Sequence, residues 1–210
     1  MIYIMTPCFR TENLVKMKVS IPKECTWVVV YDKKVGTDHQ CISDECIFSD
    51  KTGYYGNPLR NEFLDKFSDR FTKDDWVYIL DDDNLIHPEW YQSVMEVIDT
   101  DEFGVNFINW GQVERLPAVL NPKVGDIDTA CYMYKPKKFK NVRYKLEYSA
   151  DGIFAEKIFQ KSKPSTIFRD LCYYNILDPK PPVVKINSDV LESGKVNPTL
   201  LLFLSQNGEL

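Results

Sequence analysis

Residues 76–84 read WVYILDDDN, a run of apolar side chains that ends abruptly in Asp81, Asp82 and Asp83. The run predicts a buried strand with the three carboxylates at its carboxyl end. Adjacent carboxylates repel one another and resist desolvation unless a cation neutralises them. In extended backbone Asp81 and Asp83 point to one side and Asp82 to the other, so one pair can face a ligand. Oxygen ligands of this kind suit Mg²⁺ or Mn²⁺ shared with substrate phosphates, and the alternative is a solvated acidic turn before the next helix.

Short apolar runs alternate with helical patterns on either side of this stretch. Strands are predicted at 2–5, 27–31, 76–80 and 104–109, and helices from Thr11, from Asn57-Pro58 and from about Pro88. Thr11 and Asn57 are the predicted N-caps. The alternation predicts βα units, and therefore an α/β fold with a mainly parallel, Rossmann-like central sheet flanked by helices in a single domain.

The helix that follows Asn57 carries an apolar stripe. Its members recur every four residues, at Leu59, Phe63, Phe67 and Phe71. This spacing places them on one face of the helix, which we expect to pack on the core.

The regular alternation stops near residue 110. A strand at 129–134, a helix at about 151–161 and a return to the sheet at 166–177 predict a mixed second half. We expect residues 1–109 to bind a nucleotide-type ligand and residues 110–178 to face the second substrate. Residues 179–210 have a weaker pattern, and we expect them to pack on the domain as a tail or to lead to a further domain.

The composition is typical of a soluble globular protein. The 210 residues are 44% hydrophobic and 27% charged, with a net charge of −5, which disfavours nucleic acid as a partner. Apolar runs such as 200–204 are much shorter than the roughly 20 residues that span a bilayer. Residues 1–5 lack the basic start of a signal peptide. We therefore expect a cytoplasmic protein without a membrane-spanning segment.

Six cysteines are scattered along the chain, at Cys8, Cys25, Cys41, Cys46, Cys131 and Cys172. None lies in a Cys-x-x-Cys or Cys/His spacing typical of a zinc site. We predict free thiols, with disulfides as the alternative that the even number allows.

Several motifs occur in an order that resembles one enzyme family. Thr6-Pro7 and Arg10 follow the first strand, Asp32 ends the second, Arg60-Asn61 lies in a helix, Asp-x-Asp ends a later strand, and Ala150-Asp151-Gly152 comes further on. Over residues 1–175 this order resembles the GT-A fold of nucleotide-sugar glycosyltransferases. It looks closest to the N-terminal domain of multidomain chlorella-virus members, which implies a viral protein of the host cytoplasm with further domains in the same polypeptide.

The resemblance implies roles for individual residues. It implies a donor-binding set of Thr6, Pro7, Arg10, Asp32, Arg60, Asp81 and Asp82, in which Asp32 contacts the base or ribose and Asp81 lies near the ribose. It also implies that Asp83, with Asp81, holds the Mn²⁺ or Mg²⁺ that bridges the donor's two phosphates. Such a metal stabilises the negative charge that develops on a leaving nucleoside diphosphate.

Asp151 is the candidate general base. Transfer with inversion needs one carboxylate that takes the acceptor hydroxyl's proton, and Asp151 resembles the base of inverting members of this fold. The alternative is a plain helix N-cap. Asp128 and then Asp126 are the rival bases.

Trp110 and Asp128 are the candidate acceptor-binding residues. Tyr132 and Tyr134 also offer flat faces to a sugar, although aromatic residues in strands more often pack in the core. His87, just before Pro88, is better explained as part of the turn that leads into a helix than as a metal ligand.

The sequence thus predicts an enzyme that transfers one sugar from a nucleoside-diphosphate sugar, a UDP-sugar by preference, to the hydroxyl of a glycan or another acceptor, with inversion. No Gln-x-x-Arg-Trp motif follows Asp151, so we expect the enzyme to be non-processive. One alternative is a sugar-nucleotide nucleotidyltransferase, although residues 6–10 contain none of the glycines expected after its first strand. A non-catalytic nucleotide- or glycan-binding domain of the same fold is the other.

Overall fold

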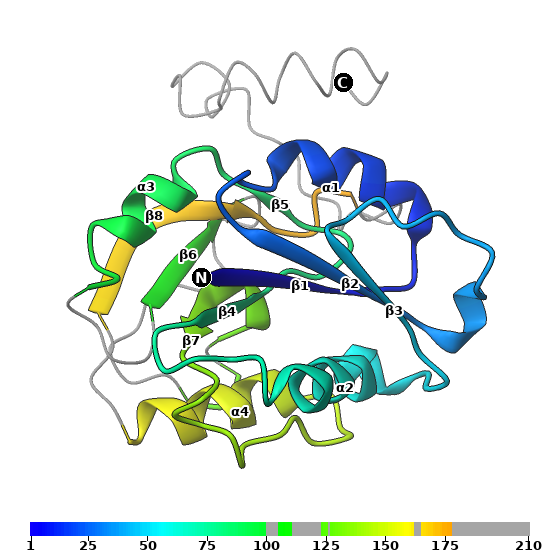
Figure 1. Ribbon diagram of the computed structural model, residues 1–210. Coiled ribbons are helices and arrows are strands. Elements are labelled where there is room, and N and C mark those ends of the chain that lie inside the picture. Colours follow the sequence, from blue (N-terminus) through cyan, green and yellow to red (C-terminus); the bar gives the residue numbers. More distant parts are fainter. Residues whose placement is uncertain (100–104, 111–122, 126, 162–164, 178–210) are drawn as a thin grey trace. The chain divides into compact units, whose positions relative to one another are not determined.

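The computed structural model describes residues 1–99, 105–110, 123–125, 127–161 and 165–177. Their strands form one sheet in the order β3-β2-β1-β4-β7-β6-β8-β5 (Figure 1). The first four in this order are parallel: β3 (Glu45–Phe48), β2 (Thr26–Tyr31), β1 (Ile2–Cys8) and β4 (Trp76–Ile79). The other four are β7 (Tyr132–Tyr134), β6 (Val105–Trp110), β8 (Ser165–Tyr173) and β5 (Leu85–Ile86), among which only β6 and β8 pair in parallel. The sheet is therefore mixed but mostly parallel, which confirms the predicted class.

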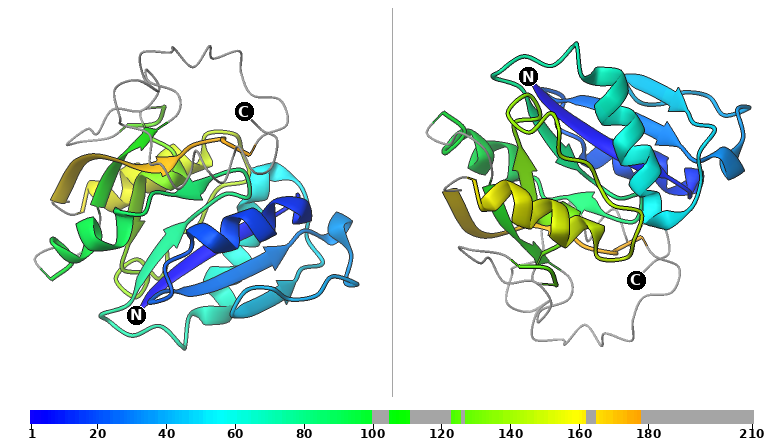
Figure 2. Two further views of the ribbon diagram at one scale, coloured as in Figure 1. Left: turned by 90° about the horizontal axis from the view of Figure 1, so that it is seen from above. Right: turned by 90° about the horizontal axis from the view of Figure 1, so that it is seen from below.

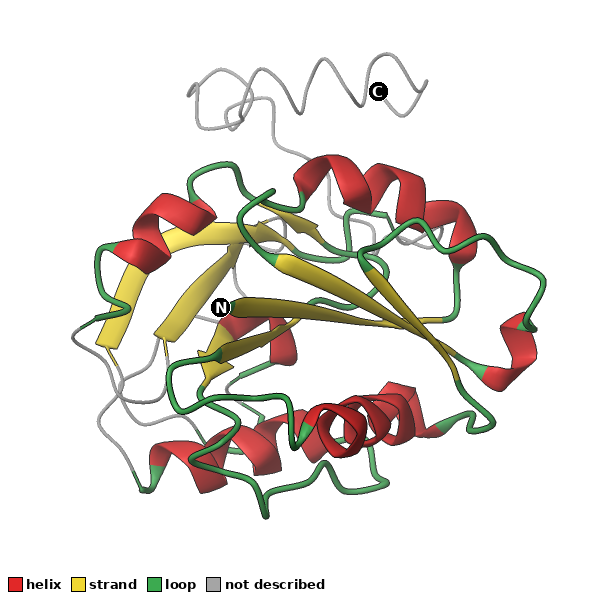
Figure 3. Ribbon diagram, viewed as in Figure 1, coloured by secondary structure: helices red, strands yellow, loops and turns green. Residues whose placement is uncertain are grey.

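Helices cover both faces of this sheet (Figures 2 and 3). On one face lie α1 (Leu14–Ser20) and α3 (Trp90–Met95), and on the other α2 (Asn57–Phe67) and α4 (Ala150–Phe159). Short 3₁₀ turns connect the elements: η1 (Thr11–Asn13), η2 (Lys33–Val35), η3 (Tyr54–Gly56) and η4 (Thr129–Cys131). Because both faces are covered, every residue of β4 is buried, which is why its sequence is continuously apolar and does not alternate.

The apolar stripe of α2 packs on the core as predicted. Leu59, Phe63 and Phe67 are buried, and the rings of Phe63 and Phe67 lie 4.7 Å apart. Phe71 is also buried, but it follows the end of the helix. The face that these rings form contacts the same core as α4.

Both predicted N-caps are wrong. A 3₁₀ turn occupies Thr11 and its neighbours, so α1 starts three residues later without a side-chain cap. Gly56, at φ +81°, precedes α2 in place of Asn57. A Cβ on Gly56 would lie 3.1 Å from Cβ of Pro7, so any side chain at this positive-φ position would be strained.

The sequence missed two short strands and misplaced boundaries. The strand predicted at 129–134 begins only at Tyr132, because residues 129–131 form the 3₁₀ turn η4. β3 and β5 are too short for a periodic pattern, and β3 is only partly buried at the sheet's edge. β1 extends to Cys8, so Thr6 and Pro7 belong to a buried strand and not to the loop that the Thr-Pro pair suggested.

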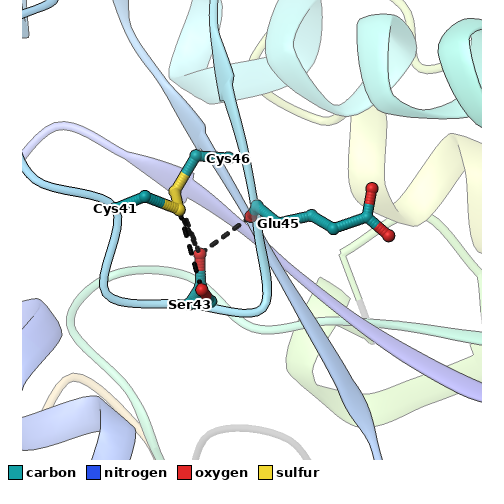
Figure 4. Close-up of a disulfide and its surroundings, with 4 residues drawn as sticks. All are labelled: Cys41, Ser43, Glu45 and Cys46. Atoms are coloured by element: carbon teal, nitrogen blue, oxygen red, sulfur yellow. Dashed lines mark hydrogen bonds between the residues drawn. A yellow bond between two sulfur atoms is a disulfide. The ribbon is translucent and has the colours of Figure 1, made fainter.

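Cys41 and Cys46 form a disulfide, so the prediction of six free thiols is wrong for these two (Figure 4). The loop before β3 brings their Cα atoms to 5.8 Å, which is within the range that a disulfide spans. Inside this loop Ser43 donates a hydrogen bond to the carbonyl of Glu45 at 2.8 Å. The remaining cysteines, Cys8, Cys25, Cys131 and Cys172, are buried free thiols as predicted.

None of the helices in the described part of the chain has both the length and the apolar character needed to cross a bilayer.

Candidate functional site

The candidate site lies where β1, β2 and β4 end. These strands are parallel, so Arg10, Asp32 and the acidic triplet all follow carboxyl ends at one edge of the sheet, the usual place for ligands in open α/β sheets. Next to Asp81, a cavity of about 330 Å³ is lined by residues from both halves of the chain, among them Arg60, Asp128 and Asp151. The fold thus brings together the candidate base and part of the predicted donor-binding set.

The acidic triplet turns, in contrast to the extended backbone that the sequence predicted. β4 ends at Ile79, and the amide of Asn84 donates to the carbonyl of Asp81 at 3.1 Å. As a result Asp82 and Asp83 both bind Arg10, while Asp81 binds Arg60 on the side of the cavity. The predicted pairing of Asp81 with Asp83 on one side of a strand is therefore wrong.

Asp82 is a buried anchor for the loop that follows β1. Only 1% of the residue is exposed. Its carboxylate accepts hydrogen bonds from the amides of Phe9 and Arg10, the latter at 2.8 Å, and from the guanidinium of Arg10. Asp82 therefore orients this loop, and a direct contact with a donor would require these bonds to break.

Asp83 is the carboxylate of the triplet best suited to a metal ion. Burial and the nearby charge of Asp81 raise the pKa of Asp83 to about 6. Its Oδ2 accepts from Arg10 at 2.8 Å, and Oδ1 has no protein partner among the described residues. No group of three or more His, Cys, Asp or Glu side chains in those residues could hold a metal by itself. A metal ion at Asp83 would therefore need substrate oxygens and water as its further ligands.

Arg60 supplies a fixed positive charge to the cavity. It is 5% exposed and donates from Nη2 to Oδ1 of Asp81 at 2.6 Å. Its Nη1 donates to Oδ1 of Asn57 at 2.6 Å and to the carbonyl of Tyr55 at 2.9 Å, and its guanidinium lies 5.5 Å from the ring centre of Tyr144. Its Nε has no hydrogen-bond partner within the described part of the chain.

Asp128 is held by three donors. Tyr174 donates to Oδ2 at 2.8 Å, and the amide of Ala130 reaches Oδ1 at 3.5 Å. The hydroxyl of Thr129 lies 3.0 Å from Oδ1 of Asp128 and 3.2 Å from Oδ2 of Asp81, so its one proton serves one carboxylate at a time. Burial and the charge of Asp81 raise the pKa of Asp128. Both oxygens are thus engaged, which disfavours Asp128 as a base.

Asp151 has an oxygen available toward the cavity. It is the second residue of α4, and the amide of Gly152 donates to its Oδ1 at 2.9 Å. Oδ2 has no hydrogen-bond partner among the described residues. Ser149 stands at the N-cap position, so the alternative interpretation of Asp151 as the cap does not hold. Burial and the charge of Asp128 raise the pKa of Asp151 to about 6, a value suited to proton transfer near neutral pH.

Gly152 allows this arrangement to pack. A Cβ at this position would lie 3.0 Å from Cα of Val124. Residues 124 and 125, which also line the cavity, can approach α4 only because position 152 is a glycine.

Asp32, Thr6 and Pro7 are not among the residues that line the cavity. Asp32 is buried and accepts from the amides of Lys34 at 2.8 Å and Gly53 at 3.3 Å. Thr6 is buried and accepts from Nε1 of Trp27 at 3.0 Å, and Pro7 is buried beside Gly56. The structure brings these residues to the expected edge, and their contact with a nucleotide stays a prediction.

The remaining candidates have different outcomes. Trp110 ends β6, but its side chain lies outside what the structure describes, as does Asp126. Tyr132 and Tyr134 are buried, so they pack in the core and offer no face to a sugar. His87 accepts from the amide of Glu89 at 3.1 Å just before α3, in agreement with the predicted turn.

Among the cavity-lining residues that sequence reasoning missed are four with aromatic or amide side chains, namely Tyr55, Asn57, Tyr148 and Tyr174. The sequence contains a signal for one of them, because GYYG at 53–56 places aromatic residues between two glycines in a turn. Nothing in the local sequence marks the other three, which reach the cavity only through the tertiary fold.

Comparisons with known proteins support the fold. No protein-family profile matches the chain, and no curated protein does. Among solved structures, S. aureus TarS 1–349 superposes with a TM-score of 0.62 and 15% identity over 82% of this chain and 59% of that one. TarS 1–349 in complex with UDP-GlcNAc superposes with a TM-score of 0.61 and 15% identity over 82% of this chain and 57% of that one. A 4-diphosphocytidyl-2C-methyl-D-erythritol synthase superposes with a TM-score of 0.50 and 10% identity over 91% of this chain and 95% of that one.

The structural matches cover only part of the TarS fragments and share little sequence identity with this chain. The chain spans about three fifths of the TarS fragment it matches. The resemblance to chlorella-virus enzymes stays a prediction. At these sequence identities the comparisons bear on the fold alone. They confirm the predicted single-domain α/β fold of GT-A type.

Proposed function

We propose that this chain transfers a single sugar from a nucleoside-diphosphate sugar, preferably a UDP-sugar, to an acceptor hydroxyl with inversion. The observation that carries the proposal is the position of Asp151, whose pKa is about 6, in one cavity with Arg60 and Asp81. A base near neutral pKa beside a fixed cation is the arrangement that glycosyl transfer requires. The complex of TarS with UDP-GlcNAc, a protein of the same fold, supports the donor class.

Asp151 acts on the acceptor. The amide of Gly152 holds Oδ1, so Oδ2 accepts the proton of the acceptor hydroxyl. As that proton leaves, the hydroxyl oxygen bonds to the anomeric carbon and the bond from that carbon to the diphosphate oxygen breaks. A pKa of about 6 keeps Asp151 ionised at neutral pH and still basic enough to accept a proton.

Arg60 places one fixed cation on the donor side of the cavity, where it is paired with Asp81. Arg60 is fixed by Asp81, Asn57 and the carbonyl of Tyr55, so it does not need to reorganise as charge develops. Asp83 would hold the Mg²⁺ or Mn²⁺ that the fold family implies, with donor oxygens and water as the other ligands, because Asp81 is paired with Arg60. When bound, this metal neutralises charge on the two phosphates.

A second candidate function is nucleotidyl transfer to a sugar phosphate. The likeness to the erythritol synthase favours it, because that match covers nearly the whole of both chains. It has no need of a base such as Asp151, and residues 6–10 lack the glycines of a phosphate loop. We therefore rank it below glycosyl transfer.

One assay separates the two. The purified chain is incubated with Mn²⁺ and UDP-GlcNAc, UDP-glucose or UDP-galactose, and UDP release is measured with and without acceptor glycans. A parallel reaction contains UTP or CTP with sugar 1-phosphates and measures pyrophosphate. Donor-dependent UDP release that Asp151→Asn abolishes supports the proposal. Pyrophosphate release that survives Asp151→Asn supports the second candidate. If neither UDP nor pyrophosphate is released, the chain is a binding domain.

A further inference from the structure

Tyr55 and Tyr148 expose their rings at the cavity that holds Asp151. Tyr55 is 64% exposed and Tyr148 73%, and both line the cavity. The rings meet edge to face, with centroids 5.2 Å apart and planes at 78°. We propose that this tyrosine pair is the acceptor platform, and that the acceptor is a carbohydrate whose pyranose ring packs its C–H face against Tyr148 and Tyr55. This inference rests on the proposed function and identifies the class of its acceptor.

The exposure of the pair distinguishes it from the other aromatic residues nearby. Tyr132 and Tyr144 are buried and pack against Phe154 in the core. Tyr55 and Tyr148 contact each other edge to face, and most of the surface of both residues stays exposed. Apolar faces beside a few convergent polar groups are typical of small-molecule sites, and tyrosine combines an apolar ring with a polar tip.

The backbones of both tyrosines are held by buried polar side chains. Asn57 donates from Nδ2 to the carbonyl of Glu147 at 3.0 Å, which ties the segment before α4 to the start of α2. Arg60 donates to the carbonyl of Tyr55 at 2.9 Å. Tyr55 has φ +57° and ψ 29°, a left-handed conformation that an aromatic residue rarely adopts. Strain of this kind persists where the surrounding structure enforces it, as at ligand clamps.

The position of the pair favours the acceptor over the donor. Tyr148 lies three residues before Asp151, and the base must contact the acceptor hydroxyl that it deprotonates. The donor diphosphate is assigned to Arg60 and Asp83, whereas Tyr148 lies in the segment that leads into α4 and Asp151. Asp128, Asp151 and Asn57 also line the cavity and provide oxygens that accept hydrogen bonds from sugar hydroxyls.

The test measures binding without turnover. Saturation-transfer difference NMR titrations with methyl pyranosides of glucose, galactose, mannose, N-acetylglucosamine and xylose, in the presence of UDP and Mn²⁺, compare four proteins. These are wild type, Tyr148→Ala, Tyr148→Phe and the matched control Tyr54→Ala. Tyr54 is also exposed and has a positive φ, but it does not line the cavity. Calorimetry with UDP and melting curves on the same preparations check donor binding and folding.

We expect at least one pyranoside to bind about tenfold more weakly to Tyr148→Ala, which corresponds to about 1.4 kcal/mol, because the variant loses the aromatic contact. Tyr148→Phe and Tyr54→Ala should stay within about twofold of wild type, and UDP affinity should not change.

Three results would overturn the platform: pyranoside binding unaffected by Tyr148→Ala, no pyranoside bound by a wild-type protein that binds UDP, or a fall in UDP affinity, which would mean that the donor base packs there. If the wild type binds no UDP, the proposed function fails, and the pyranoside titrations still decide the platform.

Discussion

Arg60 and Asp81 form an ion pair of 2.6 Å that joins α2 to the end of β4. The two residues are 21 positions apart in the sequence, and their side chains meet at the cavity that also holds Asp151. Because Arg60 is buried, its charge is retained only through Asp81 and its other acceptors. The pair therefore fixes the cation of the site before any substrate binds.

Asp151→Asn should remove transfer and leave the fold intact. General-base catalysis is worth about 10² to 10⁴ in rate, and the amide keeps an oxygen that accepts from Gly152. We expect at least a hundredfold lower initial rate at saturating donor, with a melting temperature close to that of wild type. Near-normal transfer would move the role to Asp128 or Asp126, and a product that retains the donor's anomeric configuration would remove the need for an inverting base.

The pH dependence of both rate and stability should report Asp151. The pKa of Asp151 is about 6 in the folded protein, whereas the ordinary value of an Asp carboxyl, which applies to the unfolded chain, is 3.8. The base must be ionised, so the transfer rate should rise as pH increases through about 6. The folded state binds this proton more tightly than the unfolded one, so the stabilisation is present below about pH 4 and is lost as pH rises from about 4 to about 6. Asp151→Asn should make this pH dependence of the unfolding free energy less steep and leave the contribution of Asp83, whose pKa is also raised to about 6; urea denaturation at each pH measures it. An unchanged slope would contradict the assigned pKa.

Asp83→Ala should reduce the effect of metal on nucleotide binding. A ligand that binds only the folded state raises the melting temperature. We expect wild type to show a larger shift with UDP and Mn²⁺ than with UDP and chelator, and Asp83→Ala to lose most of that difference. Asp74→Ala, at an exposed position away from the cavity, is the control. An undiminished metal effect in Asp83→Ala would exclude Asp83 as a ligand.

Asp82→Ala should destabilise the protein more than Asp83→Ala does. Asp82 is buried, and its loss leaves the amides of Phe9 and Arg10 and the Arg10 guanidinium without their acceptor. Breaking a buried ion pair from one side costs about 3–5 kcal/mol. Denaturant unfolding of both variants measures the difference. Equal losses of unfolding free energy in the two variants would show that Asp82 stabilises the loop after β1 no more than Asp83 does.

The oxidised protein should contain four reactive thiols after denaturation, and six after reduction, since Cys41 and Cys46 are paired. Thiol titration in guanidinium with and without prior dithiothreitol measures both numbers. The Cys41→Ser, Cys46→Ser double variant should lose about 2 kcal/mol of stability, the value expected for so short a loop. Six thiols without reductant would mean that the disulfide is absent.

The sequence by itself determined the elements whose signal is local. The apolar runs of β2 and β4, the four-residue stripe of α2 and the placement of the acidic triplet at the end of a strand follow from periodicity and burial. Asp151 at the start of a helix was found in the same way. Each of these features depends on residues within about one turn or one strand, so no knowledge of distant contacts was needed.

The tertiary structure decided which of these residues act together. The direction of each carboxylate in the triplet depends on distant residues, because Arg10 binds Asp82 and Asp83 while Arg60 binds Asp81. The disulfide, the short strands β3 and β5 and the pairing of Tyr55 with Tyr148 likewise depend on segments brought together by the sheet. Burial and neighbouring charge, which set the pKa of Asp151, are properties of the assembled cavity and have no local sequence pattern.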